Sequence, residues 1–209
     1  MPDLPVMLRI SGKKAVIVGG GSVALRRAAA LTACGADVTV IAPHVDEEIQ
    51  KLAVHIDRRP YHDGDLEGAR LVVIATDDPQ VNEAAHREAD RVGALVNRTD
   101  APDRGDLAVM AHDRRGAVTV AVATDGISAK AAATIRDELL VELDQDWVRL
   151  LEAVAPFRGL LQERVKDLGR RRAALMKLAD VESVALLKES GVEALRARCQ
   201  AIVREATTP

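Results

Sequence analysis

Residues 15–24 read AVIVGGGSVA, a stretch that joins a short β-branched run to a glycine-rich turn and an alanine-rich segment. It matches the pattern G-x-G-x-x-A directly after a predicted strand and directly before a predicted helix, the context that a dinucleotide-binding turn requires. Gly19 allows the tight turn, Gly21 lets the backbone approach a pyrophosphate, and Ala24 stays small so that the helix can pack on the sheet. The helix N-terminus would present unpaired N–H groups to the phosphates. The alternative is a glycine turn in the same kind of fold with no nucleotide.

Around this turn the first half of the chain alternates apolar runs with helical segments. The run at 71–74 is wholly apolar, as expected of a strand covered on both faces in a parallel sheet. Asp78 as N-cap, Pro79 at the first position and Gly93 after the last turn punctuate the helix that follows. The pattern predicts an α/β fold, a Rossmann-like doubly wound parallel sheet. Strands are predicted at 15–18, 37–41, 55–58, 71–74 and 94–96, and helices at 22–34, 45–52 and 79–92.

The second half changes character. A last strand is predicted at 117–122, and Ser128 is expected to cap a helix that ends near residue 143. Only helices are predicted after residue 146. An apolar stripe at helical spacing runs from Trp147 to Leu168, with Pro156 expected to kink or break it. Further helical pieces are predicted at 170–179, 181–188 and 192–206. The predicted division is a nucleotide-binding domain (1–113), a strand-helix connector for dimerisation (114–145) and an all-helical C-terminal domain (146–209).

Composition narrows the possible functions. The chain has 209 residues and a formal net charge of −3, so no global charge attracts nucleic acid. One Tyr, one Trp and one Phe are too few for a base-stacking surface. No apolar run is long enough to cross a bilayer, and no signal peptide is predicted at the N-terminus. The two cysteines lack metal-ligand spacing, so no metal site is predicted, and a reducing, cytoplasmic location is expected.

The ends of the predicted strands supply further candidates, because open α/β sheets bind ligands outside the carboxyl ends of their strands. The strand at 37–41 is followed by Pro43 and His44, with neither the acidic residue typical of NAD sites nor an arginine for NADP. Thr76 and Asp77 follow the strand at 71–74 and could face the nicotinamide ribose. Asp100 follows the strand at 94–96, a position suited to a general base, although a Thr-Asp-Ala-Pro stretch is also an ordinary turn.

Several of these segments, in this order, resemble a known family. The chain is similar to the precorrin-2 dehydrogenase/sirohydrochlorin ferrochelatase module of siroheme synthesis, and the likeness covers nearly its whole length. The segments that carry it are LPVML (4–8), VIVGGGSVA (16–24), ATDDPQVN (75–82), NRTD (97–100), Arg115-Gly116, the turn at 124–130 and the arginine-rich tail.

The resemblance implies oxidation of precorrin-2 to sirohydrochlorin with NAD as hydride acceptor, followed in some members by insertion of ferrous iron. It places the family's essential aspartate on Asp100 as general base. It also implies a homodimer in which the connector and tail form much of the interface. The implied NAD contacts are Ser22, Val23, Pro43 and His44, and more loosely Thr76 and Asp77. The candidate substrate ligands are Arg98, Thr124, Ser128 and Lys130, since a tetrapyrrole polycarboxylate needs cationic and hydrogen-bonding partners.

Two stretches depart from the family pattern. Residues 125–129 read DGISA where the family usually has Gly-Gly-x-Ser-Pro, and Met110-Ala111 stands where a Pro-Ala pair is expected. Asp125 adds negative charge near a site for an anionic substrate. Two alternatives therefore stay open: a non-catalytic NAD(H)-sensing regulatory module, and an oxidoreductase that acts on another anionic molecule.

Overall fold

The computed structural model describes residues 3–208 and divides the chain into two compact units. The first unit ends at Val109 and the second begins at Met110. The predicted three-part division, with boundaries after residues 113 and 145, stays a prediction.

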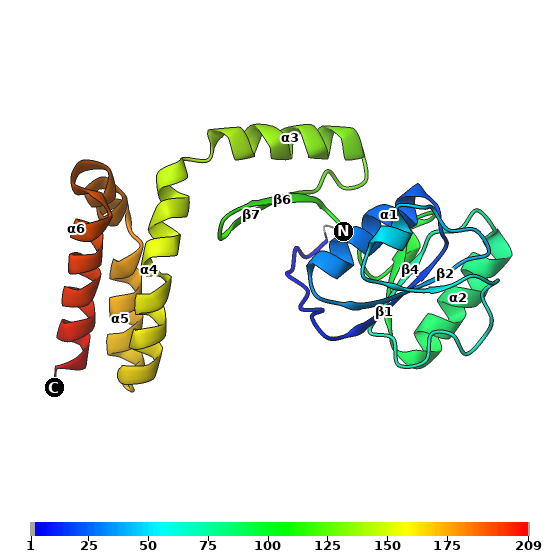
Figure 1. The fold of residues 1–209 in the computed structure, drawn as a ribbon, viewed down its shortest axis with the longest axis horizontal. Helices are drawn as coiled ribbons and strands as arrows, with labels where there is room; N and C mark the ends of the chain where they lie inside the picture. Colours follow the sequence, from blue (N-terminus) through cyan, green and yellow to red (C-terminus); the bar gives the residue numbers. More distant parts are fainter. Residues whose placement is uncertain (1–2, 209) are drawn as a thin grey trace. The chain divides into compact units, whose positions relative to one another are not determined.

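The first unit is built on a five-stranded parallel sheet with the strand order β3-β2-β1-β4-β5 (Figure 1). This is the order of a doubly wound nucleotide-binding sheet, in which β1 lies at the centre and the chain crosses over it between β3 and β4. The predicted fold class is confirmed. The strands are β1 (Lys14–Val18), β2 (Asp37–Ile41), β3 (His55–Asp57), β4 (Leu71–Ile74) and β5 (Leu95–Arg98).

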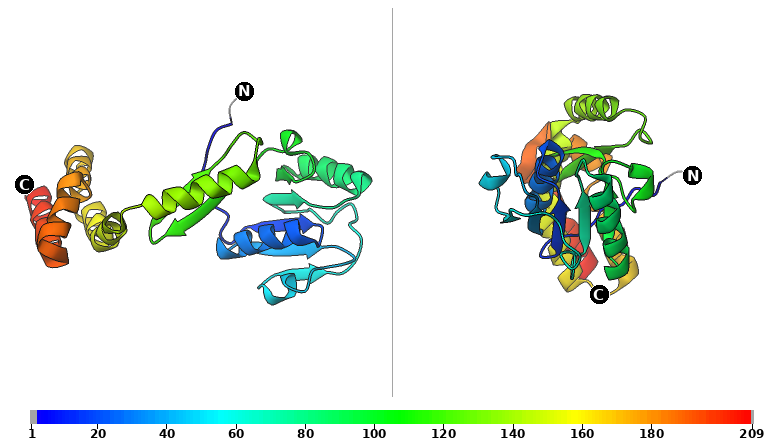
Figure 2. Two further views of the ribbon diagram at one scale, coloured as in Figure 1. Left: turned by 90° about the horizontal axis from the view of Figure 1, so that it is seen from above. Right: turned by 90° about the vertical axis from the view of Figure 1, so that its right-hand side faces the viewer.

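Helices cover both faces of this sheet, and this explains why β4 and residues 15–18 of β1 are apolar (Figure 2). On one face α1 (Ser22–Ala33) packs through Ala24 and Ala28 against the odd-numbered side chains of β1. On the other face α2 (Pro79–Val92) packs through Ala85 and Ala89 against the even-numbered ones. Small helix residues let the helices approach the sheet, and alternate strand residues point to opposite faces.

The boundaries of α2 follow the predicted signals. The Asp78 carboxylate accepts hydrogen bonds from Gln80 N at 2.8 Å and from Val81 N at 3.3 Å. At the other end Gly93 adopts the left-handed conformation with φ 70°, which glycine reaches without steric strain. The helix therefore begins and ends where the sequence predicts.

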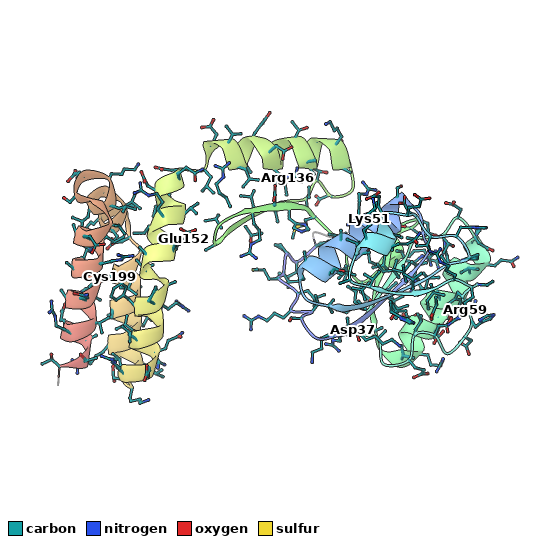
Figure 3. The ribbon with its side chains drawn as sticks, viewed as in Figure 1. Asp37, Lys51, Arg59, Arg136, Glu152 and Cys199 are labelled. Atoms are coloured by element: carbon teal, nitrogen blue, oxygen red, sulfur yellow. The ribbon has the colours of Figure 1, made fainter. Side chains whose placement is uncertain are left out.

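The second unit begins with an antiparallel hairpin, β6 (Ala111–Arg115) and β7 (Val118–Val122). Arg115 pairs with Val118, so Gly116 and Ala117 form a two-residue loop. Helix α3 (Ala129–Glu142) packs on this hairpin, with Ser128 as its N-cap as predicted. Arg136 of α3 donates to the carbonyl oxygen of His112 at 3.5 Å (Figure 3).

Three further elements complete the second unit, namely α4 (Gln145–Arg164), α5 (Leu168–Leu178) and α6 (Val181–Thr207). Gly191 interrupts α6, because its φ of 81° and ψ of 179° are not helical, so the two separate pieces predicted at 181–188 and 192–206 are confirmed. They enclose an apolar core that includes Leu150, Leu161, Leu195 and Cys199, each no more than 1% exposed. Figure 3 labels Cys199 on α6. The residues that the structure describes contain no strand after β7. None of the described helices is long and apolar enough to cross a membrane.

Several local predictions are wrong. The strand β6 was not predicted, and the helix expected at 45–52 is reduced to the single 3₁₀ turn η1 (Ile49–Lys51). Pro156 does not break α4, which runs through it and packs against α5 and α6, while the kink expected at this residue stays a prediction. The stripe also ends earlier than predicted, since Leu168 is 70% exposed.

Candidate active site

The glycine-rich turn lies between β1 and α1. Gly19 has φ 126°, and a Cβ built on it would lie 2.2 Å from the carbonyl oxygen of Ala75. The turn therefore passes so close to the end of β4 that only glycine fits there. Gly19 N also donates to the carbonyl oxygen of Ile41 at 2.9 Å, which fixes the turn to the end of β2.

The N-terminus of α1 fits a pyrophosphate. A Cβ on Gly21 would meet no atom within 4 Å, so the space beside this residue is open. Gly21 is the N-cap, and no side chain accepts the N–H groups of the first helical turn, which begins at Ser22 and Val23. Free N–H donors and the positive end of the helix dipole together favour an anion at this point. Ala24 is fully buried on the sheet, in agreement with the packing role predicted for it.

The end of β2 presents exposed Pro43 and His44 beside the glycine turn. A Cβ on Gly20 would lie 2.0 Å from the carbonyl oxygen of His44, so the two segments are in contact. Asp46 N donates to the Gly20 carbonyl oxygen at 2.8 Å, and the Asp46 carboxylate accepts from Glu48 N at 2.9 Å. The Asp46 carboxylate, the first after β2, therefore caps a local turn.

The end of β4 holds a threonine whose hydroxyl is fixed by α2. Thr76 Oγ1 donates to Asn82 Oδ1 at 2.6 Å and accepts from Asp78 N at 3.1 Å. The Asn82 amide in turn donates to the Thr76 carbonyl oxygen at 3.0 Å. Asp77 lies exposed beside this pair.

Asp100 lies just past β5, and two residues donate hydrogen bonds to its carboxylate. Arg98 donates through Nε to Asp100 Oδ1 at 2.8 Å and through Nη2 to Oδ2 at 2.7 Å, a bidentate ion pair. The Asn82 amide adds a third hydrogen bond to Oδ2 at 3.0 Å. The Arg98 guanidinium lowers the pKa of the Asp100 carboxyl from 3.8 to about 2, with a further contribution from Asn82. With a side chain 33% exposed, this ionised carboxylate remains accessible.

Two further charged residues, Glu83 and Arg104, extend this ion pair. Glu83 of α2 accepts from Arg98 Nη1 and Nη2, both at 3.1 Å, and from Arg104 Nη1 at 2.6 Å. Arg104, in the 3₁₀ turn η2 (Pro102–Arg104), and Arg98 lower the pKa of the Glu83 carboxyl to about 2. Both carboxylates are therefore ionised at neutral pH.

Sequence reasoning did not assign a role to Asn82 or Glu83, and it did not predict the ion pair between Arg98 and Asp100. A signal for Asn82 was present, because it stands three residues before Ala85 on the buried face of α2. A buried amide on an apolar helix face needs hydrogen-bond partners, and here they come from the ends of β4 and β5.

The remaining candidates lie in the second unit. Thr124 Oγ1 donates to the Ser128 carbonyl oxygen at 3.0 Å, and Ser128 Oγ accepts from Ala131 N at 3.1 Å. Both hydroxyls thus stabilise the turn before α3, in which Asp125 adopts φ 48°. Lys130 is exposed. Residues 3–208 contain no group of three or more His, Cys, Asp or Glu side chains arranged to hold a metal ion.

The parallel sheet, the open glycine turn and the uncapped helix N-terminus define a Rossmann-like dinucleotide-binding protein. The chain belongs to the family described as "Putative NAD(P)-binding", whose sequence profile matches residues 6–111.

Curated relatives agree with the predicted resemblance to the siroheme synthesis module, which is confirmed. The chain is 34% identical over 176 residues to the siroheme synthase of Nitrosococcus oceani, a match covering 82% of this chain and 38% of that protein. The siroheme synthase of Psychrobacter arcticus is 30% identical over 176 residues, covering 82% and 32%. The matched region thus spans between about one third and two fifths of the length of these relatives.

A solved structure matches almost end to end. The structure of "SirC, precorrin-2 dehydrogenase" superposes with a TM-score of 0.77 at 25% identity, covering 95% of this chain and 100% of the other. The similarity therefore extends beyond the nucleotide-binding unit to the hairpin and the C-terminal helices.

Proposed function

We propose that this chain oxidises precorrin-2 to sirohydrochlorin, with NAD as the hydride acceptor, in the synthesis of siroheme. The full-length similarity to a precorrin-2 dehydrogenase and the siroheme synthase relatives support this substrate. The single observation that carries the reaction is an ionised, partly exposed carboxylate at the sheet edge where the nucleotide-binding turn lies. A parallel sheet brings the ends of β1, β4 and β5 to one edge, so Asp100 is on the side where the cofactor would be bound.

The reaction removes two electrons and two protons from the macrocycle, as one hydride and one proton. Bound NAD supplies the hydride acceptor. Asp100 would receive the proton on a carboxylate oxygen and pass it to water. Because its pKa is about 2, Asp100 is ionised at every pH at which the enzyme would work, but it is a weak base. It would receive the proton while the macrocycle becomes more acidic through the loss of hydride, and it would hold that proton only briefly.

The proposed cofactor contacts are those predicted from the sequence. Gly19 and Gly21 shape the pyrophosphate turn, Ser22 and Val23 offer their N–H groups, and Ala24 lets α1 approach the sheet. Exposed Pro43 and His44 would lie along the adenosine ribose, and Thr76 and Asp77 near the nicotinamide ribose. The exposed Lys130 would pair with a substrate carboxylate, while Thr124 and Ser128 would shape the turn that carries it.

Three further points belong to the same proposal. Ferrous iron would be a second substrate, held by the nitrogens of the macrocycle. The chain would form a homodimer, since α3 exposes Leu139 (50%) and Val141 (75%). The protein would work in the cytoplasm, where its two free thiols, Cys34 and Cys199, would stay reduced.

The test is anaerobic turnover of precorrin-2 with NAD by the purified chain, following NADH and the visible spectrum of the macrocycle. We expect matched appearance of NADH and sirohydrochlorin with the wild type, and a loss of about 10²-fold or more in Asp100→Asn with NAD affinity retained. Asp103→Asn is the matched control, since Asp103 is an exposed aspartate three residues away and should leave turnover unchanged. NAD binding without turnover would contradict the enzymatic proposal and favour the sensing module.

A further inference from the structure

The most unusual charged group in the first unit is the guanidinium of Arg98. Its side chain is only 2% exposed, although it lies at the ligand-binding edge of the sheet. A buried charge is tolerated only when it is paired and hydrogen-bonded. The structure supplies both conditions, with Asp100 on one side and Glu83 on the other.

All five N–H donors of Arg98 have partners within the protein. Nε donates to Asp100, and the two hydrogens of Nη2 go to Asp100 and Glu83. The two hydrogens of Nη1 go to Glu83 and to Nδ1 of His86, both at 3.1 Å. His86 would then carry its proton on Nε2, which lies 3.6 Å from an Asp90 carboxylate oxygen. No donor is left for a carboxylate from outside.

We infer that Arg98 is a positioning residue for Asp100, which fixes the plane of the carboxylate and keeps it ionised, and that it is not a ligand of the substrate's carboxylates. This inference rests on the proposed function and differs from the role that the sequence resemblance implies for Arg98. The bidentate pair sets the direction of both Asp100 oxygens, and the Asn82 amide donates a further hydrogen bond to Oδ2. These three hydrogen bonds occupy both lone pairs of Oδ2 and one of Oδ1, so the remaining lone pair of Oδ1 is the one that could accept a proton.

The chemistry of the substrate gives this arrangement a purpose. A tetrapyrrole polycarboxylate brings many negative charges next to Asp100, and nearby negative charge raises the pKa of a carboxyl group. A buried cation at hydrogen-bond distance opposes this shift, and it is less screened by salt than an exposed cation would be. Asp100 would consequently remain an acceptor of protons when the substrate is bound.

Glu83 has a separate part in the arrangement. It holds Arg98 from the side opposite Asp100 and is itself bound by both nitrogens of Arg104, at 2.6 and 2.8 Å. The charged groups around Asp100 are thus Arg98 from β5, Glu83 from α2 and Arg104 from η2. Removing the charge of Glu83 would leave the positive charge of Arg98 less neutralised, so Arg98 would act more strongly on Asp100. Removing the charge of Arg98 would leave Asp100 next to the negative charge of Glu83. The two changes are expected to move the pKa of Asp100 in opposite directions.

The decisive measurement is the carboxyl pKa of Asp100 in the full chain without substrate, by carbon-13 NMR of labelled aspartate, with the signal assigned by its loss in Asp100→Asn. In the wild type this signal should not titrate above about pH 4, because ordinary aspartates titrate near 3.9. In Arg98→Gln its midpoint should rise by about 1–3 units. In Glu83→Gln the midpoint should fall, because a neighbouring negative charge is removed. Arg104→Gln, with the same charge change on an arginine 52% exposed, should shift it by much less.

Two results would overturn the inference: a wild-type Asp100 with an ordinary pKa, or an equal rise in Arg98→Gln and Arg104→Gln. If Arg98→Gln does not fold, the wild type still gives an answer. The Arg98 Nε–H should be protected from exchange with solvent and should lose that protection in Asp100→Asn. An unprotected Nε–H in the wild type would contradict the inference.

Kinetics separate this inference from the proposed function. With precorrin-2, Arg98→Gln should lower kcat by about 10-fold or more, shift the acid limb of the pH profile upward, and leave the KM for precorrin-2 unchanged. A higher KM with kcat unchanged would make Arg98 a substrate ligand and refute the positioning role. If the wild type shows no turnover, the proposed function fails, while the NMR titration still decides whether Arg98 holds Asp100.

Discussion

Exchanging the two outer glycines of the turn for alanine should separate its folding role from its cofactor role. In Gly19→Ala the new Cβ would lie 2.2 Å from the Ala75 carbonyl oxygen, so the end of β4 would have to move by about 1 Å, at roughly 1–3 kcal/mol. The φ of 126° adds backbone strain of about 1–3 kcal/mol, because residues other than glycine rarely adopt it. The expected loss of about 2–6 kcal/mol is a large part of the 5–15 kcal/mol that is typical of a domain.

Gly21→Ala should behave differently. Gly21 has φ −88°, which alanine adopts freely, and the new Cβ would meet no atom within 4 Å. Stability should fall by no more than about 1 kcal/mol, the effect of a poorer N-cap. NAD binding should weaken by about 10-fold or more, because the methyl group would occupy the space where the pyrophosphate approaches α1.

The assays are urea unfolding for stability and calorimetric titration with NAD for binding. A Gly19→Ala variant within about 1 kcal/mol of the wild type would refute the packing argument, since strain and overlap predict more. A Gly21→Ala variant that binds NAD as tightly as the wild type would refute the placement of the pyrophosphate. If both variants lose stability equally, the claim that Gly19 packs tightly whereas the space beside Gly21 is open would be refuted.

Two further predictions concern stability in the first unit. Burial raises the pKa of Tyr61 above 10.0, and so does the hydrogen bond that its hydroxyl donates to the buried carboxylate of Glu88. The free energy of unfolding should therefore be constant below pH 10 and should fall as the pH rises further, because the unfolded chain loses this proton first. Phenolate absorbance, which reports the only tyrosine of the chain, should therefore appear together with unfolding, and ionisation of Tyr61 in the folded state would contradict this. Asp78→Ala removes the acceptor for the N–H groups of Gln80 and Val81 and should lower the free energy of unfolding by about 1 kcal/mol in urea titrations. Asp77→Ala, one residue away and outside the cap, is its control, and an equal loss in both variants would show that the cap contributes nothing.

Local sequence signals were sufficient for most of the first unit. The apolar runs at β1 and β4 are buried on both faces, and the Asp78, Pro79 and Gly93 signals mark the ends of α2. These features depend on residues close together in the chain, and on a side-chain alternation that is the same in every buried strand.

Other elements were not visible locally. Residues 111–115 read AHDRR, which lacks an apolar alternation, yet they form β6 because the backbone pairs with β7 through a tight turn. The proline in α4 is tolerated because α5 and α6 pack along that helix, and helix propensity is a weak determinant against such packing. Both errors have one cause, since the stabilising partner lies elsewhere in the chain.

In the candidate site, too, some features follow from local sequence and others depend on tertiary packing. The sequence by itself determined the nucleotide-binding turn, the parallel sheet and the position of Asp100 after a strand, because short-range spacing encodes each of them. Only the tertiary structure decided that Arg98 faces inward, that it pairs with Asp100 and Glu83, and that Asn82 completes the pair. These groups come from β5, the loop that follows it and α2, and their distances depend on how the helix packs on the sheet. The charge and direction of the candidate catalytic carboxylate are therefore properties of the folded chain.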